Sequence, residues 1–271
     1  MSTNKNVVIL VLAAFLVTVS MIPYRKKTTR SSERKRILFI HHSTGGNLIK
    51  EGNLRDEIRK LDSNIEFWDH NYNLFPLFTY LLAGNTHLKG LSDSDGKVTG
   101  VDYRITLSNN SPKEYAEIFA RDPSDLTLKA ILDYDVVAFK NCYPTTRITS
   151  DQQLQEDIDY YSSIRNNLSR YPNTQFVLLT PPPAREETTN LANAERTKKL
   201  VNYLNSSEFV GSTTNIHVFD FFSLLADGTG MLKKKYTRPL FFDSHPNKLG
   251  NIYISPIFAK YLVEISKEGI I

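Results

Sequence analysis

Five apolar, β-branched segments alternate with helical patterns along most of the chain. The segments are continuously apolar, which is typical of strands buried on both faces of a parallel sheet. The predicted strands are residues 37–41, 65–68, 136–140, 175–180 and 216–221. Amphipathic or capped stretches predict helices at residues 48–61, 124–132, 151–168, 191–204 and 249–266. This alternation predicts a three-layer α/β/α domain with a five-stranded parallel sheet.

One connection is unusually long. Residues 69–123 hold a helix-like piece at 77–82 and a loop rich in Gly, Asp and Ser at 90–100. Connections of this length usually carry function or lack structure of their own. Because sites of open α/β sheets lie beyond the carboxyl ends of the strands, we expect this connection to border the site.

The N-terminal residues differ from the rest of the chain. Residues 1–36 hold eight Lys/Arg and one acid, whereas the remaining 235 residues hold 25 Lys/Arg and 28 Asp/Glu. The basic character therefore belongs to the N-terminal tail, and the slightly acidic domain is not expected to bind nucleic acid. The single cysteine, Cys142, excludes a disulfide within the chain.

An apolar run at residues 7–22 precedes a basic stretch at 25–35. We interpret residues 1–24 as a signal peptide or an N-terminal membrane anchor, residues 25–35 as a basic linker and residues 36–271 as the folded domain. The protein is then membrane-associated through a single span at 7–22, or exported after cleavage. An extracytoplasmic domain is favoured by the usual fate of such segments, although the basic flank after the run favours the cytoplasm.

Several chemically capable residues follow the predicted strands. Ser43 comes after the first strand and Asn141 after the third, while Asp243 and His245 precede the last helix. A serine hydroxyl becomes a nucleophile when a base such as histidine takes its proton, and a carboxylate can orient that histidine. An asparagine amide can stabilise an oxyanion. These segments converge on one edge if the sheet is parallel.

The order of these elements resembles the SGNH, or GDSL-type, hydrolases over roughly residues 36–268. The most specific part is the run from Asp243 to Asn247, followed at once by a helix. The resemblance implies a flavodoxin-like sheet, no cofactor and no metal. It also implies a serine esterase or O-deacylase that acts on a small acyl ester, a glycan or a lipid, with Ser43 as nucleophile and His245 as general base.

The resemblance assigns further roles. Asp243 would orient His245, Asn141 would complete the oxyanion hole, and Gly90 is the first choice for the oxyanion glycine, with Gly100 second. This sequence departs from the family at three places: His41-His42 precede the serine where Gly-Asp is usual, Lys140 and Cys142 flank Asn141 where the family has glycine and aspartate, and Asp243 stands two residues before the histidine instead of three. An atypical member fits this pattern.

Two alternatives remain open. The departures fit a non-catalytic binding or assembly protein that keeps the fold. A metal-dependent hydrolase would use His41, His42, Asp69 and His70, but adjacent residues on a strand point to opposite faces, so His41 and His42 do not easily share an ion. One of these two histidines is expected to pack inward and the other to line the mouth of the site.

Overall fold

The computed structural model describes residues 34–72, 90–103, 105 and 111–268. The chain divides into two units, residues 1–32 and 33–271, and the first lies outside the described residues. Three expected segments lie outside the described residues: the apolar run 7–22, nearly all of the basic linker 25–35, and the helix-like piece 77–82. The structure that follows is that of the second unit.

A six-stranded sheet forms the middle of this unit, in the order β3-β2-β1-β4-β5-β6. Its parallel strands are β1 (Lys35–His41), β2 (Ile65–Asn71), β4 (Val136–Lys140), β5 (Gln175–Leu179) and β6 (Ile216–Phe219). All five predicted strands are confirmed, and their spatial order is that of flavodoxin-like folds. The sheet also has a short sixth strand, β3 (Gly90–Ser92), which pairs antiparallel with β2 at the edge.

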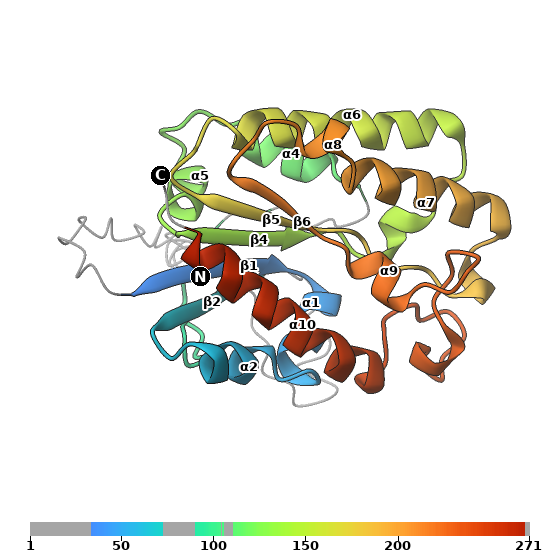
Figure 1. Cartoon of the computed structure of the whole chain (residues 1–271), viewed down its shortest axis with the longest axis horizontal. Helices are drawn as coiled ribbons and strands as arrows, with labels where there is room; N and C mark the ends of the chain where they lie inside the picture. Colours follow the sequence, from blue (N-terminus) through green and yellow to red (C-terminus); the bar gives the residue numbers. More distant parts are fainter. Residues whose placement is uncertain (1–33, 73–89, 104, 106–110, 269–271) are drawn as a thin grey trace, which may run out of the picture. The chain divides into compact units, whose positions relative to one another are not determined.

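Helices cover both faces of the sheet (Figure 1). One face packs against α1 (Ser43–Lys50), α2 (Leu54–Leu61), α9 (Phe221–Leu225) and α10 (Lys248–Lys267). The other packs against α4 (Lys113–Phe119), α5 (Leu126–Ile131), α6 (Asp151–Leu168), α7 (Leu191–Leu204) and α8 (Ser207–Val210). The predicted three-layer α/β/α architecture is confirmed.

Alternate side chains of each strand supply the two cores. On β1, Leu38 and Ile40 join the core beneath α4–α8, whereas Ile37 and Phe39 join the core beneath α1, α2 and α10. Because successive side chains point to opposite faces, a strand covered on both sides must be apolar throughout, which explains the continuous apolar runs.

The helix expected at 48–61 is two helices. The chain turns at Asn53, whose φ of 57° is left-handed, so α1 ends before it and α2 begins after it. Gly52 fits this corner because a Cβ there would lie 2.6 Å from the backbone carbonyl oxygen of Asn251 on α10. The helix α4 was not predicted; it lies near the end of the long connection.

Candidate functional site

The site lies where the strand order reverses, at the carboxyl ends of β1 and β4. Ser43 is the first residue of α1 and follows β1 after one residue, His42. His42 occupies the N-cap position, and α1 has no side-chain cap hydrogen bond, so Ser43 is not a capping residue here. Open α/β sheets bind ligands at this kind of switch point.

Ser43 and His245 are in direct contact. The Oγ atom of Ser43 lies 2.6 Å from Nε2 of His245, although the two residues are 202 positions apart. The same oxygen lies 3.1 Å from Nδ1 of His42 and 3.7 Å from Sγ of Cys142. The structure thus brings the serine between two imidazoles and a thiol.

Asp243 reaches the other side of the His245 ring. Its Oδ1 atom lies 2.5 Å from Nδ1 and also accepts a hydrogen bond of 2.9 Å from the backbone N–H of His245. Burial works against the charged form of Asp243, yet the hydrogen bonds from His245 lower the pKa of its carboxyl. An ionised carboxylate can only accept hydrogen bonds, so Asp243 keeps a proton on Nδ1 of His245. In the neutral imidazole, Nε2 then carries no proton and can accept the hydrogen bond of the Ser43 hydroxyl.

Arg185 binds the backbone of the segment that leads to Asp243. This guanidinium is buried, and its Nη1 donates to the carbonyl oxygens of Arg238 at 2.9 Å and Leu240 at 2.6 Å. The rings of Tyr143 and His245 form a T-shaped pair, with centroids 4.9 Å apart and an interplanar angle of 88°. The imidazole is therefore fixed by a hydrogen bond at each nitrogen and by an aromatic neighbour.

A buried thiol lies beside the serine, and a buried amine lies close to that thiol. Sγ of Cys142 is 2.9 Å from Oγ1 of Thr44 and 3.9 Å from Nε2 of His245. Burial alone would raise the pKa of Cys142, but the charge of buried Lys140 and the His245 ring hold it well below its usual value. Burial lowers the pKa of the Lys140 amine, and the attraction of the Cys142 thiolate offsets part of this effect.

These neighbours change the basicity of His245. Burial favours its neutral form, but the hydrogen bond to Asp243 and the nearby Cys142 thiolate raise the pKa of the imidazole to about 9. The sequence did not identify Cys142 or Arg185 as neighbours of the site, and it placed one of His41 and His42 at the mouth without deciding which. The position of Cys142 directly after Asn141, past the same strand, is the signal that could have placed it there.

Asn141 is buried at the end of β4. Its Nδ2 donates to the carbonyl oxygen of Ser111 at 2.9 Å, and its Oδ1 accepts from the Tyr161 hydroxyl at 3.1 Å. These bonds fix the orientation of the amide. Its neighbour Cys142 contacts Ser43, so Asn141 belongs to the same corner of the sheet, but the structure gives it no direct hydrogen bond to Ser43 or His245.

The two candidate oxyanion glycines lie in the long connection. Gly90 pairs with Asn71 across β2 and β3, has a φ of 117°, and a Cβ on it would lie 2.6 Å from the carbonyl oxygen of Val101. Gly100 has a φ of 79° and open space around it. Among the described residues, the contacts of Gly90 are with β2 and Val101.

The four residues of the alternative metal site do not gather at one point. His41 is buried and lies 2.9 Å from Asp69 through Nε2, while Asp69 also pairs with Arg55. His42 faces Ser43 as expected for a residue at the mouth of the site, and His70 stacks on Tyr103. Within the described residues, no group of three His, Cys, Asp or Glu is placed to hold a metal ion.

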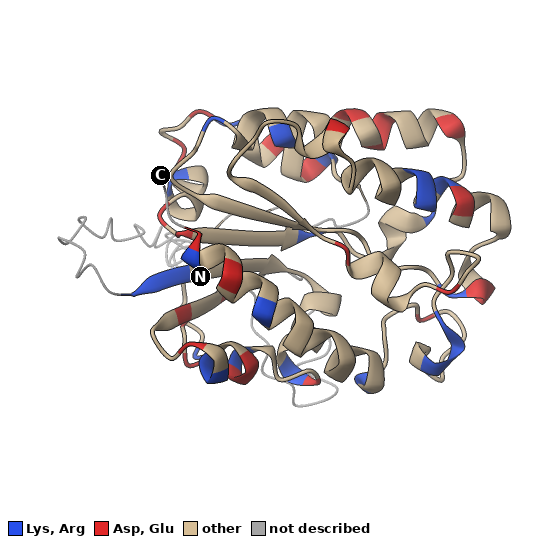
Figure 2. Ribbon diagram, viewed as in Figure 1, with Lys and Arg blue, Asp and Glu red and all other residues tan. Residues whose placement is uncertain are grey.

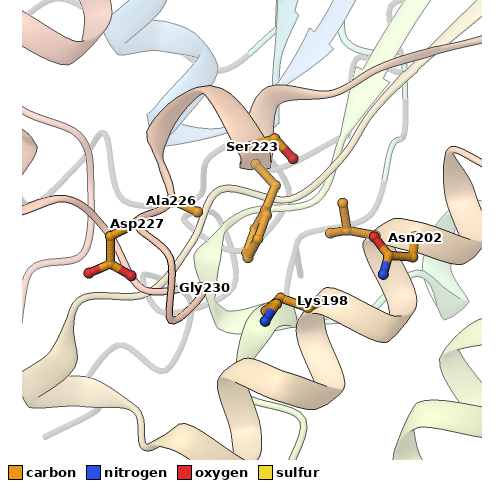
Figure 3. A pocket seen from close by; sticks show the side chains of 8 residues that line it. Lys198, Asn202, Ser223, Ala226, Asp227 and Gly230 are labelled. Atoms are coloured by element: carbon orange, nitrogen blue, oxygen red, sulfur yellow. The ribbon is translucent and has the colours of Figure 1, made fainter.

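Two other features bear on binding. A pocket of about 180 Å³ lies between α7 and the segment after α9, lined by Lys198, Asn202 and Asp227 among others (Figure 3). None of its lining residues is part of the Ser43–His245–Asp243 contacts.

None of the helices in the described part of the chain has the length and apolar character needed to span a bilayer.

Comparison with known proteins gave matches in solved structures alone. Neither a protein-family model nor a curated protein matches the chain. A GDSL-like lipase from Bacteroides thetaiotaomicron is 11% identical with a TM-score of 0.47, and the match covers 85% of this chain and 88% of the lipase. A protein provisionally named an acylhydrolase, from Bacteroides fragilis, is 12% identical with a TM-score of 0.46 over 86% and 88% of the two chains. A protein provisionally named a platelet activating factor, from Streptococcus pneumonia, is 19% identical with a TM-score of 0.46 over 86% of each chain.

Proposed function

We propose that the protein is a serine hydrolase of the SGNH type that cleaves ester-linked acyl groups. The observation that carries the proposal is the chain of contacts from Ser43 Oγ through the His245 ring to Asp243, at 2.6 and 2.5 Å. A hydroxyl within hydrogen-bond reach of a base, itself oriented by a third group, is the arrangement that activates a serine nucleophile.

The reaction follows from these contacts. Ser43 Oγ attacks the acyl carbonyl carbon while its proton passes to Nε2 of His245. The imidazolium, stabilised by Asp243, then gives that proton to the leaving alcohol as the C–O ester bond breaks. Water, deprotonated by His245, attacks the acyl-serine and releases the carboxylic acid, which restores the Ser43 hydroxyl.

The negative charge on the tetrahedral intermediate needs fixed donors. Ser43 stands at the N-terminus of α1, where the first backbone N–H groups have no acceptor within the helix. Its own N–H is the first proposed donor. Asn141 uses one amide hydrogen on Ser111, and the second is the other proposed donor. Gly90 remains a proposed third donor, from its place in the sequence.

We further propose an acylated carbohydrate or lipid of the cell envelope as the substrate. The support is the apolar run at residues 7–22, which would keep the domain close to a membrane on the extracytoplasmic side or direct its export. An ester on a small alcohol, a glycan or a glycerolipid presents the same carbonyl to Ser43, so the reaction does not distinguish them.

Hydrolysis of p-nitrophenyl acetate by the full chain tests the proposal. We expect Ser43→Ala to lower kcat/KM by about 10³-fold or more, because the nucleophile is lost. Ser223→Ala is the matched control: this serine is exposed near the pocket of Figure 3 and should keep the parent rate. A fluorophosphonate probe should label the parent and Ser223→Ala but not Ser43→Ala. Equal turnover in all three proteins, with no labelling, would refute the proposal.

A second candidate is a binding or assembly protein that keeps the fold without catalysis. The observation in its favour is the pKa of His245, raised to about 9, because an imidazole protonated at neutral pH cannot take a proton from Ser43. If this candidate is correct, the fluorophosphonate probe leaves Ser43 unlabelled even at pH values above 9.

A further inference from the structure

Exposed large apolar side chains gather in one stretch of the described chain. Seven of the ten such side chains fall between residues 240 and 257. They are Leu240, Phe241, Phe242, Leu249, Ile252, Tyr253 and Ile257. Single exposed apolar residues are ordinary, but a cluster of this kind marks an interaction site. We call it the 240–257 face.

The first part of the face is held rigidly by its backbone. Phe241 and Phe242 are 67% and 57% exposed, and their rings contact each other with centroids 5.4 Å apart. Arg185 binds the carbonyl oxygen of Leu240 on one side, and the N–H of Asp243 binds the same oxygen at 3.0 Å. The segment thus presents its side chains outward because its backbone is anchored inward.

The second part of the face is one side of α10. Ile252 and Tyr253 follow Leu249 by three and four positions, and Ile257 follows Tyr253 by four, so these residues share one side of the helix. No Lys, Arg, Asp or Glu stands between Lys248 and Lys260, and this stretch of α10 is free of both charge colours in Figure 2. This side of α10 is therefore apolar and exposed to solvent.

The two parts are joined through η3 (Lys234–Tyr236). The Tyr236 ring stacks on Tyr253, with centroids 6.0 Å apart, and its carbonyl oxygen accepts from the backbone N–H of Asn247 at 2.8 Å. The chain that leads into residues 240–242 therefore packs against the beginning of α10. The two parts of the face thus flank His245 in the chain and are linked to each other through η3.

The stretch of chain that carries the face is net positive, because residues 233–257 hold five Lys/Arg and one Asp. Of these bases, Arg238 is paired with Glu51 at the end of α1. Lys234, Lys235 and Lys248 are exposed; Lys234 lies 3.6 Å from Glu186. An apolar surface bordered by lysines complements the acyl region and anionic headgroups of a bilayer, as in amphipathic surfaces that lie in the membrane interface.

We propose that the 240–257 face docks on a bilayer with anionic headgroups. The apolar side chains enter the acyl region, and the lysines contact the headgroups. Phe242 stands three residues before His245, so docking brings the Ser43–His245 pair to the lipid surface. The docking itself does not depend on Ser43 being a nucleophile, and its failure is distinguishable from failure of the proposed reaction.

Tryptophan fluorescence in the full chain tests the docking. The chain has one tryptophan, Trp68, so a second one reports on its own position against a constant background. Phe242→Trp is the test variant. Leu126→Trp is the matched control, because Leu126 is 66% exposed at the start of α5, on the opposite face of the sheet. Both variants keep residues 1–33, so any binding through that segment is shared.

Vesicles of phosphatidylglycerol and brominated phosphatidylcholine should quench Phe242→Trp roughly two-fold more than Leu126→Trp, because bromine quenches tryptophans within the acyl region. The excess quenching of Phe242→Trp should be smaller in vesicles of brominated phosphatidylcholine alone, because these lack anionic headgroups. The same excess in the Ser43→Ala background separates docking from catalysis. If circular dichroism shows that Phe242→Trp is misfolded, Ile252→Trp replaces it.

Equal quenching in the two variants, or none in either, would overturn the proposal. A concentration-dependent blue shift of Phe242→Trp in buffer without vesicles would identify a second copy of the chain as the occupant, and would also overturn it.

Discussion

A single carboxylate oxygen of Asp243 accepts two hydrogen bonds from His245, one from the backbone N–H and one from Nδ1 of the ring. The two residues are separated by Ser244 alone, whereas the family that the sequence resembles has a three-residue spacing. The shorter spacing reaches the ring because the aspartate folds back over its own turn, in the way that Asx side chains bind the backbone two residues on. One atom thereby fixes both the turn and the imidazole.

This double role predicts the effect of Asp243→Asn. The amide is uncharged and does not stabilise the imidazolium or enforce the productive tautomer, so kcat/KM should fall by about 10²- to 10⁴-fold. Esterase kinetics with p-nitrophenyl acetate measure the loss. Asp227→Asn is the matched control, because Asp227 accepts backbone N–H bonds from Thr229 and Met231 in a turn that lacks a histidine. An Asp243→Asn enzyme as active as this control would show that the carboxylate plays no part in the reaction.

Cys142 predicts an unusual pH dependence. Only neutral His245 can accept the Ser43 proton, and its pKa is raised to about 9, so kcat/KM should rise as the pH increases through about 9. Cys142→Ser removes the thiolate that helps hold the imidazolium. The midpoint should therefore move to lower pH, with higher activity at neutral pH. The pH profile of kcat/KM measures both midpoints, and coincident profiles would contradict the electrostatic role of the thiol.

Gly45 predicts a packing effect on stability. A Cβ at this position in α1 would collide with the Cβ of His41 and would lie 2.9 Å from the Phe39 ring. Both atoms belong to the buried strand β1, so Gly45→Ala should lower the free energy of unfolding by about 1–3 kcal/mol. Urea unfolding measures this change in the free energy of unfolding. The control is Gly228→Ala, where a Cβ meets open space, and a loss of equal size there would refute the explanation.

The regular elements were largely readable from the sequence because burial and capping act locally. The helices α6 and α7 begin and end as predicted, and their N-caps, Ser150 and Asn190, accept backbone hydrogen bonds from the residues three positions on. The β4 strand also has its predicted bounds, because every side chain in it is buried. These signals lie within a few residues of the structure that they specify.

Other features depend on contacts that the pattern does not contain. The corner at Gly52 and Asn53 exists because α10 approaches closely, and we extended one amphipathic pattern across it. Strand β3 is three residues long, too short to show periodicity, and forms by pairing with β2. The apolar positions of α4, together with Pro112 before it, could have indicated a helix inside the long connection.

The contacting residues Ser43, His245 and Asp243 could be proposed from the sequence, but the electrostatics of the site could not. The order of Ser43, Asn141, Asp243 and His245 along an alternating fold brings their strand ends to one edge. The closeness of the Cys142 thiol to Ser43 depends on side-chain direction at the end of β4, and the raised pKa of His245 depends on that closeness. A sequence gives the chemistry of each group but not the distance between them.

The 202-residue separation of Ser43 and His245 has a consequence for biosynthesis. The serine is synthesised with the first strand, whereas its partner precedes the last helix, which packs against α1 and α2 to complete one core. A chain still being synthesised lacks this core until α10, residues Lys248–Lys267, has left the exit tunnel of the ribosome. The reactive pair therefore forms late in synthesis, once His245 and the helix that follows it can pack beside the first strand.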